Sequence, residues 1–137
     1  MNNQRNQLSI EDAIALLCLC AIQVDEKIKV MELKKLISMI SLGPIFSHIK
    51  NPVEYLESLN KNYSDNEVEK IMDAAIEMLP SSLRETAYAW AYEMVLADSG
   101  VSQAEHTYLN LLVKKMGIHG ELAGKIAAVV AILNRKE

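Results

Sequence analysis

The chain has 137 residues, which is long enough to bury a sizeable core, and we expect a single domain over residues 1–137. Half of the residues are apolar, only 5% are aromatic and the β-branched residues form no alternating runs, so helices are favoured over strands. A net charge of −4 gives no basic face for nucleic acid, and we expect no nucleic-acid partner.

The N-terminal segment is polar, and residues 1–8 are expected to form a flexible tail. Its sequence, "MNNQRNQ", lacks the apolar stretch of a signal peptide, which predicts a cytoplasmic protein. The apolar run Ala13–Ile22 is about half as long as a membrane span requires, so it predicts a buried helix and no direct membrane span. Cys18 and Cys20 lie on this helix and are expected to be buried, reduced thiols.

Capping and stop signals divide the chain into helices. Ser9 and Asp12 begin the first helix, which runs to about Gln23, and a second helix covers about 29–41 before Gly43 and Pro44 stop it. Asn51 followed by Pro52 begins a further helix that runs to about Leu59. Capping boxes of the form Ser-x-x-Glu are expected to begin three more helices, at Ser64–Glu67, Ser82–Glu85 and Ser102–Glu105.

The remaining signals complete an all-α fold. Gly117 ends the helix that Ser102 begins, and a last helix covers about 119–134. The segment 85–97 is apolar nearly all round and is expected to lie centrally. We therefore predict a compact all-α bundle of about seven helices, built from two pseudo-repeated helical hairpins.

Apolar residues at helical spacing predict which face of each helix points inward. In the second helix these residues are Val30, Leu33, Leu36, Ile37 and Ile40. In the last helix they are Leu122, Ile126, Val129, Val130 and Leu133.

An internal repeat relates the two predicted hairpins. Asp25 and Asp98 are 73 residues apart (98 − 25), and the same offset relates Glu32 to Glu105. Further pairs at this offset are Leu17 with Trp90, Val24 with Ala97, Ile28 with Val101, Leu36 with Leu109, and Met39 with Leu112. Each copy consists of an apolar helix, an Asp at its end, a turn, and a Glu in the first turn of the next helix.

The repeated carboxylates predict a metal site. A helical elbow brings Asp and Glu seven residues apart onto one patch, and antiparallel packing of the hairpins would gather all four in one acidic concavity. We therefore expect Asp25, Glu32, Asp98 and Glu105 to be ligands of a hard divalent cation, namely calcium, magnesium or manganese.

A purely structural interpretation of the same residues stays open. Glu105 is the expected capping partner of Ser102, and an Asp in "DSG" is a common turn residue. Glu32 has no such partner, because Lys29 occupies the position of the capping serine.

The second elbow, "ADSGVSQAE", resembles the TerB-like tellurite-resistance family, whose fingerprint is A-D-G-x-h-S-x-x-E with h apolar, often duplicated. This copy matches at Ala97, Asp98, Val101, Ser102 and Glu105, and the first copy matches at Asp25, Ile28 and Glu32. Together with the repeat, the resemblance extends over nearly the whole chain.

The resemblance implies a compact helical fold with an acidic metal-binding surface and a role in the response to tellurite and other toxic oxyanions. It also implies protein partners, some associated with membranes, and no established enzymatic activity. We therefore expect a non-enzymatic stress-response protein that binds a divalent cation or a partner through the acidic surface. The alternative is a metal-free helical interaction module that forms a homodimer or docks on a larger complex.

Overall fold

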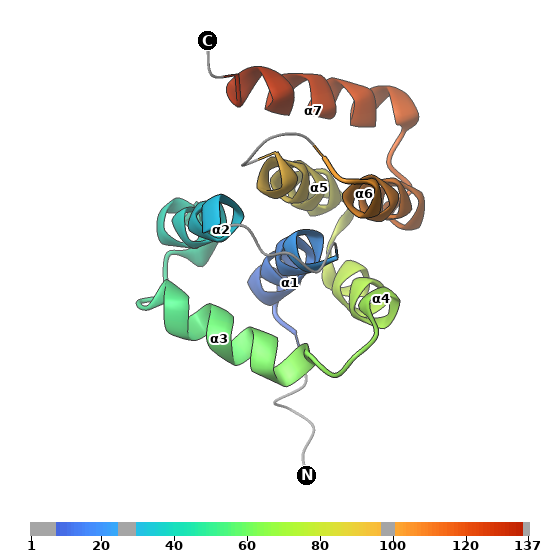
Figure 1. Cartoon of the computed structure of the whole chain (residues 1–137). Coiled ribbons are helices and arrows are strands. Elements are labelled where there is room, and N and C mark those ends of the chain that lie inside the picture. The colour runs from blue at the N-terminus through green and yellow to red at the C-terminus, as the bar shows by residue number, and fades with distance from the viewer. Residues whose placement is uncertain (1–7, 25–29, 97–100, 136–137) are drawn as a thin grey trace.

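The computed structural model of the protein describes residues 8–24, 30–96 and 101–135. Over these ranges the chain forms seven α-helices and one short 3₁₀ helix, η2, and no strand, which confirms the predicted all-α fold (Figure 1). The elements in chain order are α1 (Ile10–Gln23), α2 (Val30–Leu42), η2 (Pro44–Phe46), α3 (Pro52–Tyr63), α4 (Val68–Met78), α5 (Ser81–Val95), α6 (Gln103–Met116) and α7 (Gly120–Leu133).

Helix α1 forms the centre of the bundle. All ten residues from Ala13 to Ile22 are buried, because α2, α3, α4, α5 and α6 all pack against this helix. The predicted buried helix is therefore confirmed. Helix α5, predicted to lie centrally, packs directly on α1. Among the described helices, none combines the length and the hydropathy that a membrane crossing requires.

Burial in the two hairpins, α1–α2 and α5–α6, follows the 73-residue repeat. The buried residues of α5 are Ala87, Tyr88, Ala91, Met94 and Val95, and their counterparts in α1 are Ile14, Ala15, Cys18, Ala21 and Ile22, which are all buried. In the second helices, buried Glu32, Leu36 and Met39 correspond to buried Glu105, Leu109 and Leu112. Each second helix also packs on the first helix of the other hairpin. This exchange of contacts is the arrangement expected of two hairpins related by a pseudo-twofold axis.

Two of the expected capping boxes form, and two do not. The Ser9–Asp12 box begins α1 and the Ser102–Glu105 box begins α6, while Asn51 caps α3, as predicted. The prediction at Ser64–Glu67 is wrong, because Ser64 ends α3 and α4 begins after Glu67 without a side-chain cap. The prediction at Ser82–Glu85 is also wrong, because Pro80 is the N-cap of α5, two residues earlier, and Ser82 lies inside the first turn.

The stop signals act as predicted. Gly117 follows α6 in the left-handed conformation, with φ 68°, which glycine adopts without steric cost. Its N–H donates to the carbonyl oxygen of Lys114 at 3.2 Å. Helix α2 ends at Leu42, immediately before Gly43 and Pro44.

The predicted inward faces of α2 and α7 are partly wrong. Helix α2 turns Glu32, Leu36, Met39 and Ile40 into the core and leaves Val30 and Leu33 exposed. Helix α7 is the outermost helix in Figure 1 and buries only Ala123 and Val130, while Val129 and Leu133 are exposed. A helix that packs against one layer of neighbours has no second surface to cover its remaining apolar side chains.

The predicted flexible tail, residues 1–8, is wrong at its last residue. Leu8 is buried and belongs to the cluster of core residues. Residues 1–7 lie outside the described part of the chain.

Candidate functional site

The second elbow presents a buried carboxylate at the start of α6. The Glu105 side chain is fully buried, and its Oε1 accepts a hydrogen bond from the Ser102 N–H at 2.9 Å. In return, Ser102 Oγ accepts from the Glu105 N–H at 3.1 Å, which completes the capping box. Among the described residues, no group donates a hydrogen bond to Glu105 Oε2, although this atom is also buried. Capping therefore accounts for only one of the two carboxylate oxygens.

The first elbow presents an equivalent carboxylate on α2. Glu32 lies in the first turn of the helix and is fully buried, like Glu105 at the same position of the repeat. It lies on the same side of α2 as Leu36 and Met39. The carboxyl group is therefore the first member of a row of buried residues along this helix. The burial of a glutamate at this place is therefore a shared property of both hairpins.

The predicted metal set is only partly described. Asp25 and Asp98 lie outside the described residues. Glu32 and Glu105 are core residues rather than members of an exposed acidic surface, and α2 and α6 flank the α1–α5 pair on opposite sides (Figure 1). Within the described ranges, no three His, Cys, Asp or Glu side chains form a cluster that could hold a metal ion. Metal binding by these four residues stays a prediction, because half of them are not described.

A polar cluster that the sequence analysis did not predict joins α2, α5 and the end of α7. Lys35 Nζ lies 2.7 Å from Glu93 Oε2, and Asn134 Nδ2 donates to Glu93 Oε1 at 2.7 Å. Lys35 also donates to Asn134 Oδ1, which closes the cluster. Lys35 and Glu93 line a cleft of about 350 Å³ between α2 and α5, together with the indole of Trp90.

The repeat contained a signal for one member of this cluster. Lys35 stands 73 residues before Tyr108, a buried residue of α6 whose hydroxyl donates to the Leu17 carbonyl oxygen at 2.6 Å. Burial raises the pKa of Tyr108 well above its ordinary value, so the hydroxyl keeps its proton and remains a donor. Through its polar group, each residue joins the second helix of one hairpin to the first helix of the other: Lys35 joins α2 to α5, and Tyr108 joins α6 to α1.

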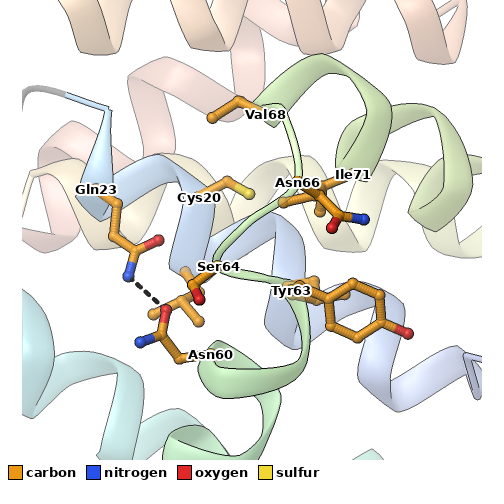
Figure 2. A pocket seen from close by; sticks show the side chains of 10 residues that line it. Cys20, Gln23, Asn60, Tyr63, Ser64, Asn66, Val68 and Ile71 are labelled. Atoms are coloured by element: carbon orange, nitrogen blue, oxygen red, sulfur yellow. Dashed lines mark hydrogen bonds between the residues drawn. The ribbon is translucent and has the colours of Figure 1, made fainter. Parts of the chain in front are cut away.

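A small cavity of about 80 Å³ lies between α1 and the segment that joins α3 to α4 (Figure 2). Cys20 and Ile71 contribute to its apolar wall. The side chains of Gln23 and Asn60 meet beside it, with Gln23 Nε2 donating to Asn60 Oδ1 at 3.0 Å. This pair ties the end of α1 to α3.

The thiol of Cys20, which lines this cavity, is not a reactive nucleophile. Cys18 and Cys20 are both buried and free, as predicted. Burial raises the pKa of Cys20 to about 12, so the sulfur is protonated and a poor nucleophile at neutral pH.

At the second elbow, one oxygen of a buried carboxylate, Glu105 Oε2, has no hydrogen-bond partner among the described residues. A carboxylate is costly to bury unless its oxygens are paired, whereas a buried thiol or tyrosine hydroxyl is ordinary core material. No family model, curated protein or solved structure matches the chain.

Proposed function

We propose that this chain is a non-enzymatic, TerB-like protein that binds a divalent cation at its helical elbows. The observation that carries the proposal is the full burial of Glu32 and Glu105 at equivalent positions of the two hairpins. In keeping with the motif, we assign the protein to a cytoplasmic response to tellurite and related toxic oxyanions, acting through protein partners.

Glu105 supports cation binding most directly. A buried polar atom without a partner costs on the order of 1–3 kcal/mol, and a charged one costs more. Oε1 is used by the Ser102 N–H, whereas Oε2 has no hydrogen-bond partner among the described residues. A cation held inside the elbow beside Oε2 would offset this cost.

The ligand chemistry fits a hard cation. Asp98 comes seven residues before Glu105 in the sequence, at the other end of the same elbow, and Asp25 has the same relation to Glu32. Carboxylates are the ligands that calcium, magnesium and manganese prefer. We therefore expect one cation at each elbow, and the second elbow to bind more tightly because Lys27 and Lys29 flank the first.

Calorimetric titration of the metal-free protein with calcium, magnesium and manganese tests the proposal. Asp98→Asn and Glu105→Gln should each abolish binding at the second elbow, while Asp25→Asn and Glu32→Gln should affect only the first. Glu105→Gln retains the oxygen that caps α6, so the helix start should persist. In the wild type, a saturating cation should also stabilise the fold by about 2.7 kcal/mol when its concentration is 100 times Kd.

Glu77→Gln is the matched control, because Glu77 is an exposed carboxylate of α4 far from either elbow in the sequence. This variant should bind the cation like the wild type. If no ion produces heat or raises the melting temperature, or if Glu77→Gln weakens binding as much as Glu105→Gln, the elbow site does not exist.

A second candidate function is a helical interaction module that needs no metal. Large apolar side chains are exposed on two neighbouring helices: Val30, Met31, Leu33 and Leu42 on α2, and Val129, Ile132 and Leu133 on α7. Exposed apolar patches of this kind commonly mark protein interfaces. A protein partner that covers these side chains would account for their exposure, whether or not the elbows bind a cation.

A further inference from the structure

Helix α4 covers a surface that is formed by one helix from each hairpin. It packs along α1 and, on one side, against α6, and it buries its apolar face there (Figure 1). Tyr108 and Leu111 of α6 line the groove between α6 and α4. At the edge of this surface, Lys115 Nζ of α6 lies 2.6 Å from Asp73 Oδ1 and 3.1 Å from Glu69 Oε2 of α4.

The pseudo-twofold relation gives the molecule a second surface of this kind. It exchanges α1 with α5 and α6 with α2, so the counterpart of α4 would pack on α5 and α2. Helix α3, which packs on α1, corresponds to α7, which packs on α5 (Figure 1). Among the described helices, none takes the position beside α5 and α2 that corresponds to α4. The described chain therefore has two equivalent helix-binding surfaces and a helix on only one of them.

The α2–α5 cleft of about 350 Å³ lies at this second surface. Its lining residues from the two helices are Lys35, Ser38, Met39, Leu42, Trp90 and Glu93. The three α6 residues named above, at positions 108, 111 and 115, stand 73 residues after Lys35, Ser38 and Leu42. The cleft is therefore lined by the positions of the repeat that contact α4 in the other half.

Side chains in the cleft are more exposed than their counterparts beneath α4. Leu42 is 82% exposed, whereas the side chain of Lys115 is only 19% exposed. Trp90 is partly buried, whereas Leu17 at the equivalent position of α1 is fully buried. An apolar surface that a packed helix would cover is thus open to solvent in the α2–α5 cleft.

We propose that the α2–α5 cleft binds an amphipathic α-helix of a partner protein, in the position that α4 has on α1 and α6. The occupied surface in the other half of the molecule identifies a helix as the occupant. Docking of an amphipathic helix into a groove uses apolar side chains three or four residues apart. One helix forms a small interface, so we expect a Kd of roughly 10–100 μM.

The residues of the cleft also specify the character of this helix. Where Lys115 pairs with the two acidic residues of α4, the cleft has Leu42, so an apolar side chain must lie opposite it. Lys35 and Glu93 already pair with each other, so they require no charge from the helix. The bound helix therefore resembles α4 on its apolar face but is apolar where α4 is acidic.

A peptide of residues 66–80 is the probe, because it contains α4, the helix that binds the equivalent surface. In the leucine form of the peptide, Glu69→Leu/Asp73→Leu replaces the acidic pair. Trp90 is the only tryptophan of the chain, so its fluorescence reports on the cleft. The leucine peptide should change the Trp90 emission of the full chain, and the unaltered peptide should bind roughly tenfold more weakly.

Two substitutions of Leu42 test where and how the peptide binds. Leu42→Glu should weaken binding of the leucine peptide by roughly tenfold or more and leave the protein folded, because Leu42 is exposed. Leu42→Lys should reverse the preference between the peptides, because the new ammonium takes the place of Lys115 and can pair with Glu69 and Asp73 of the unaltered peptide.

Val53→Glu is the matched control, since Val53 is 48% exposed on α3 and lies outside the cleft. This variant should bind the leucine peptide like the wild type. The proposal is overturned if neither peptide alters the Trp90 emission, if Val53→Glu weakens binding as much as Leu42→Glu, or if Leu42→Lys leaves the preference unchanged.

Sedimentation velocity of the protein without peptide tests a second copy as the occupant. The mass should stay at 15.3 kDa. A doubled mass that Leu42→Glu returns to the monomer value would place a second copy in the cleft and overturn the proposal. The inference rests on the second candidate function, the metal-free interaction module. All titrations contain a chelator, so their outcome is independent of the cation site.

Discussion

Cys18 and Cys20 lie in the buried stretch of α1, and burial raises the pKa of both thiols. The Cys20 thiol reaches a pKa of about 12, from an ordinary value of 9.0. In the unfolded chain the same thiols ionise near pH 9. The folded state therefore binds these protons more tightly than the unfolded state does, so their contribution to stability is complete below pH 9 and is lost as the pH rises toward 12.

We predict that the free energy of unfolding falls more steeply above pH 9 in the wild type than in Cys18→Ala/Cys20→Ala. Each thiol should account for a slope of about 1.4 kcal/mol per pH unit between its unfolded and folded pKa. Urea unfolding at several pH values between 8 and 11 measures both slopes.

The double variant is expected to be less stable at pH 8, because two small cavities replace the sulfur atoms. Only the difference in slope tests the prediction. Equal slopes in both proteins would show that the thiols ionise as easily in the folded chain as in the unfolded one.

Glu32 shows how one residue can depart from the pattern around it. The apolar spacing of α2 predicted an inward face containing Val30 and Leu33, both of which are exposed. The repeat aligns Glu32 with Glu105, and both are buried, but the sequence analysis assigned the two glutamates to an acidic concavity and did not predict their burial.

Helix starts show which local signals the chain uses. Ser-x-x-Glu occurs at Ser64, Ser82 and Ser102, but only Ser102 caps a helix. At Ser82 the preceding Pro80 has already set the backbone for a helical start, so the serine lies within the first turn. The pattern alone does not show this competition between neighbouring start signals.

We predict that Ser102→Ala lowers the free energy of unfolding by about 1 kcal/mol, because the Glu105 N–H loses its acceptor. Ser82→Ala is the matched control and should be neutral or slightly stabilising, since alanine is the better helix former inside a turn. Chemical denaturation of the two variants beside the wild type makes the comparison. Equal losses in both would mean that the serines act alike, contrary to the observed caps.

The whole molecule is organised around α1, and α7 is its most peripheral helix. The five helices on α1 form the main core, whereas α7 adds two buried residues and packs chiefly on α5. Its end is held by Asn134, which contacts Lys35 and Glu93. The bundle should therefore survive without α7.

We predict that a chain ending at Gly117 folds with its two hairpins intact and loses on the order of 3 kcal/mol of stability, comparable to the burial of one or two large apolar side chains. Hydrogen exchange tests whether the two hairpins stay folded, because the amides of α1 should remain the most protected in the shortened chain. Loss of protection throughout α1 would show that α7 is essential to the core.

The sequence by itself determined the helical class, the central burial of residues 13–22, the repeat, and the helix boundaries at Ser9, Asn51, Ser102 and Gly117. Each of these depends on local chemistry: apolar content along one helix, or a side chain that bonds the adjacent backbone. The two buried glutamates were also found by sequence, as repeated positions, although their burial was not.

Only the tertiary structure decided which surfaces meet. It selected the inward face of α2, left the end of α7 exposed, and joined Lys35, Glu93 and Asn134 from three distant segments. These outcomes depend on how much neighbouring surface each helix finds, which is a property of the assembled bundle. The pattern within one helix indicates which side chains can be buried. The packing of the other helices determines which of these side chains are buried.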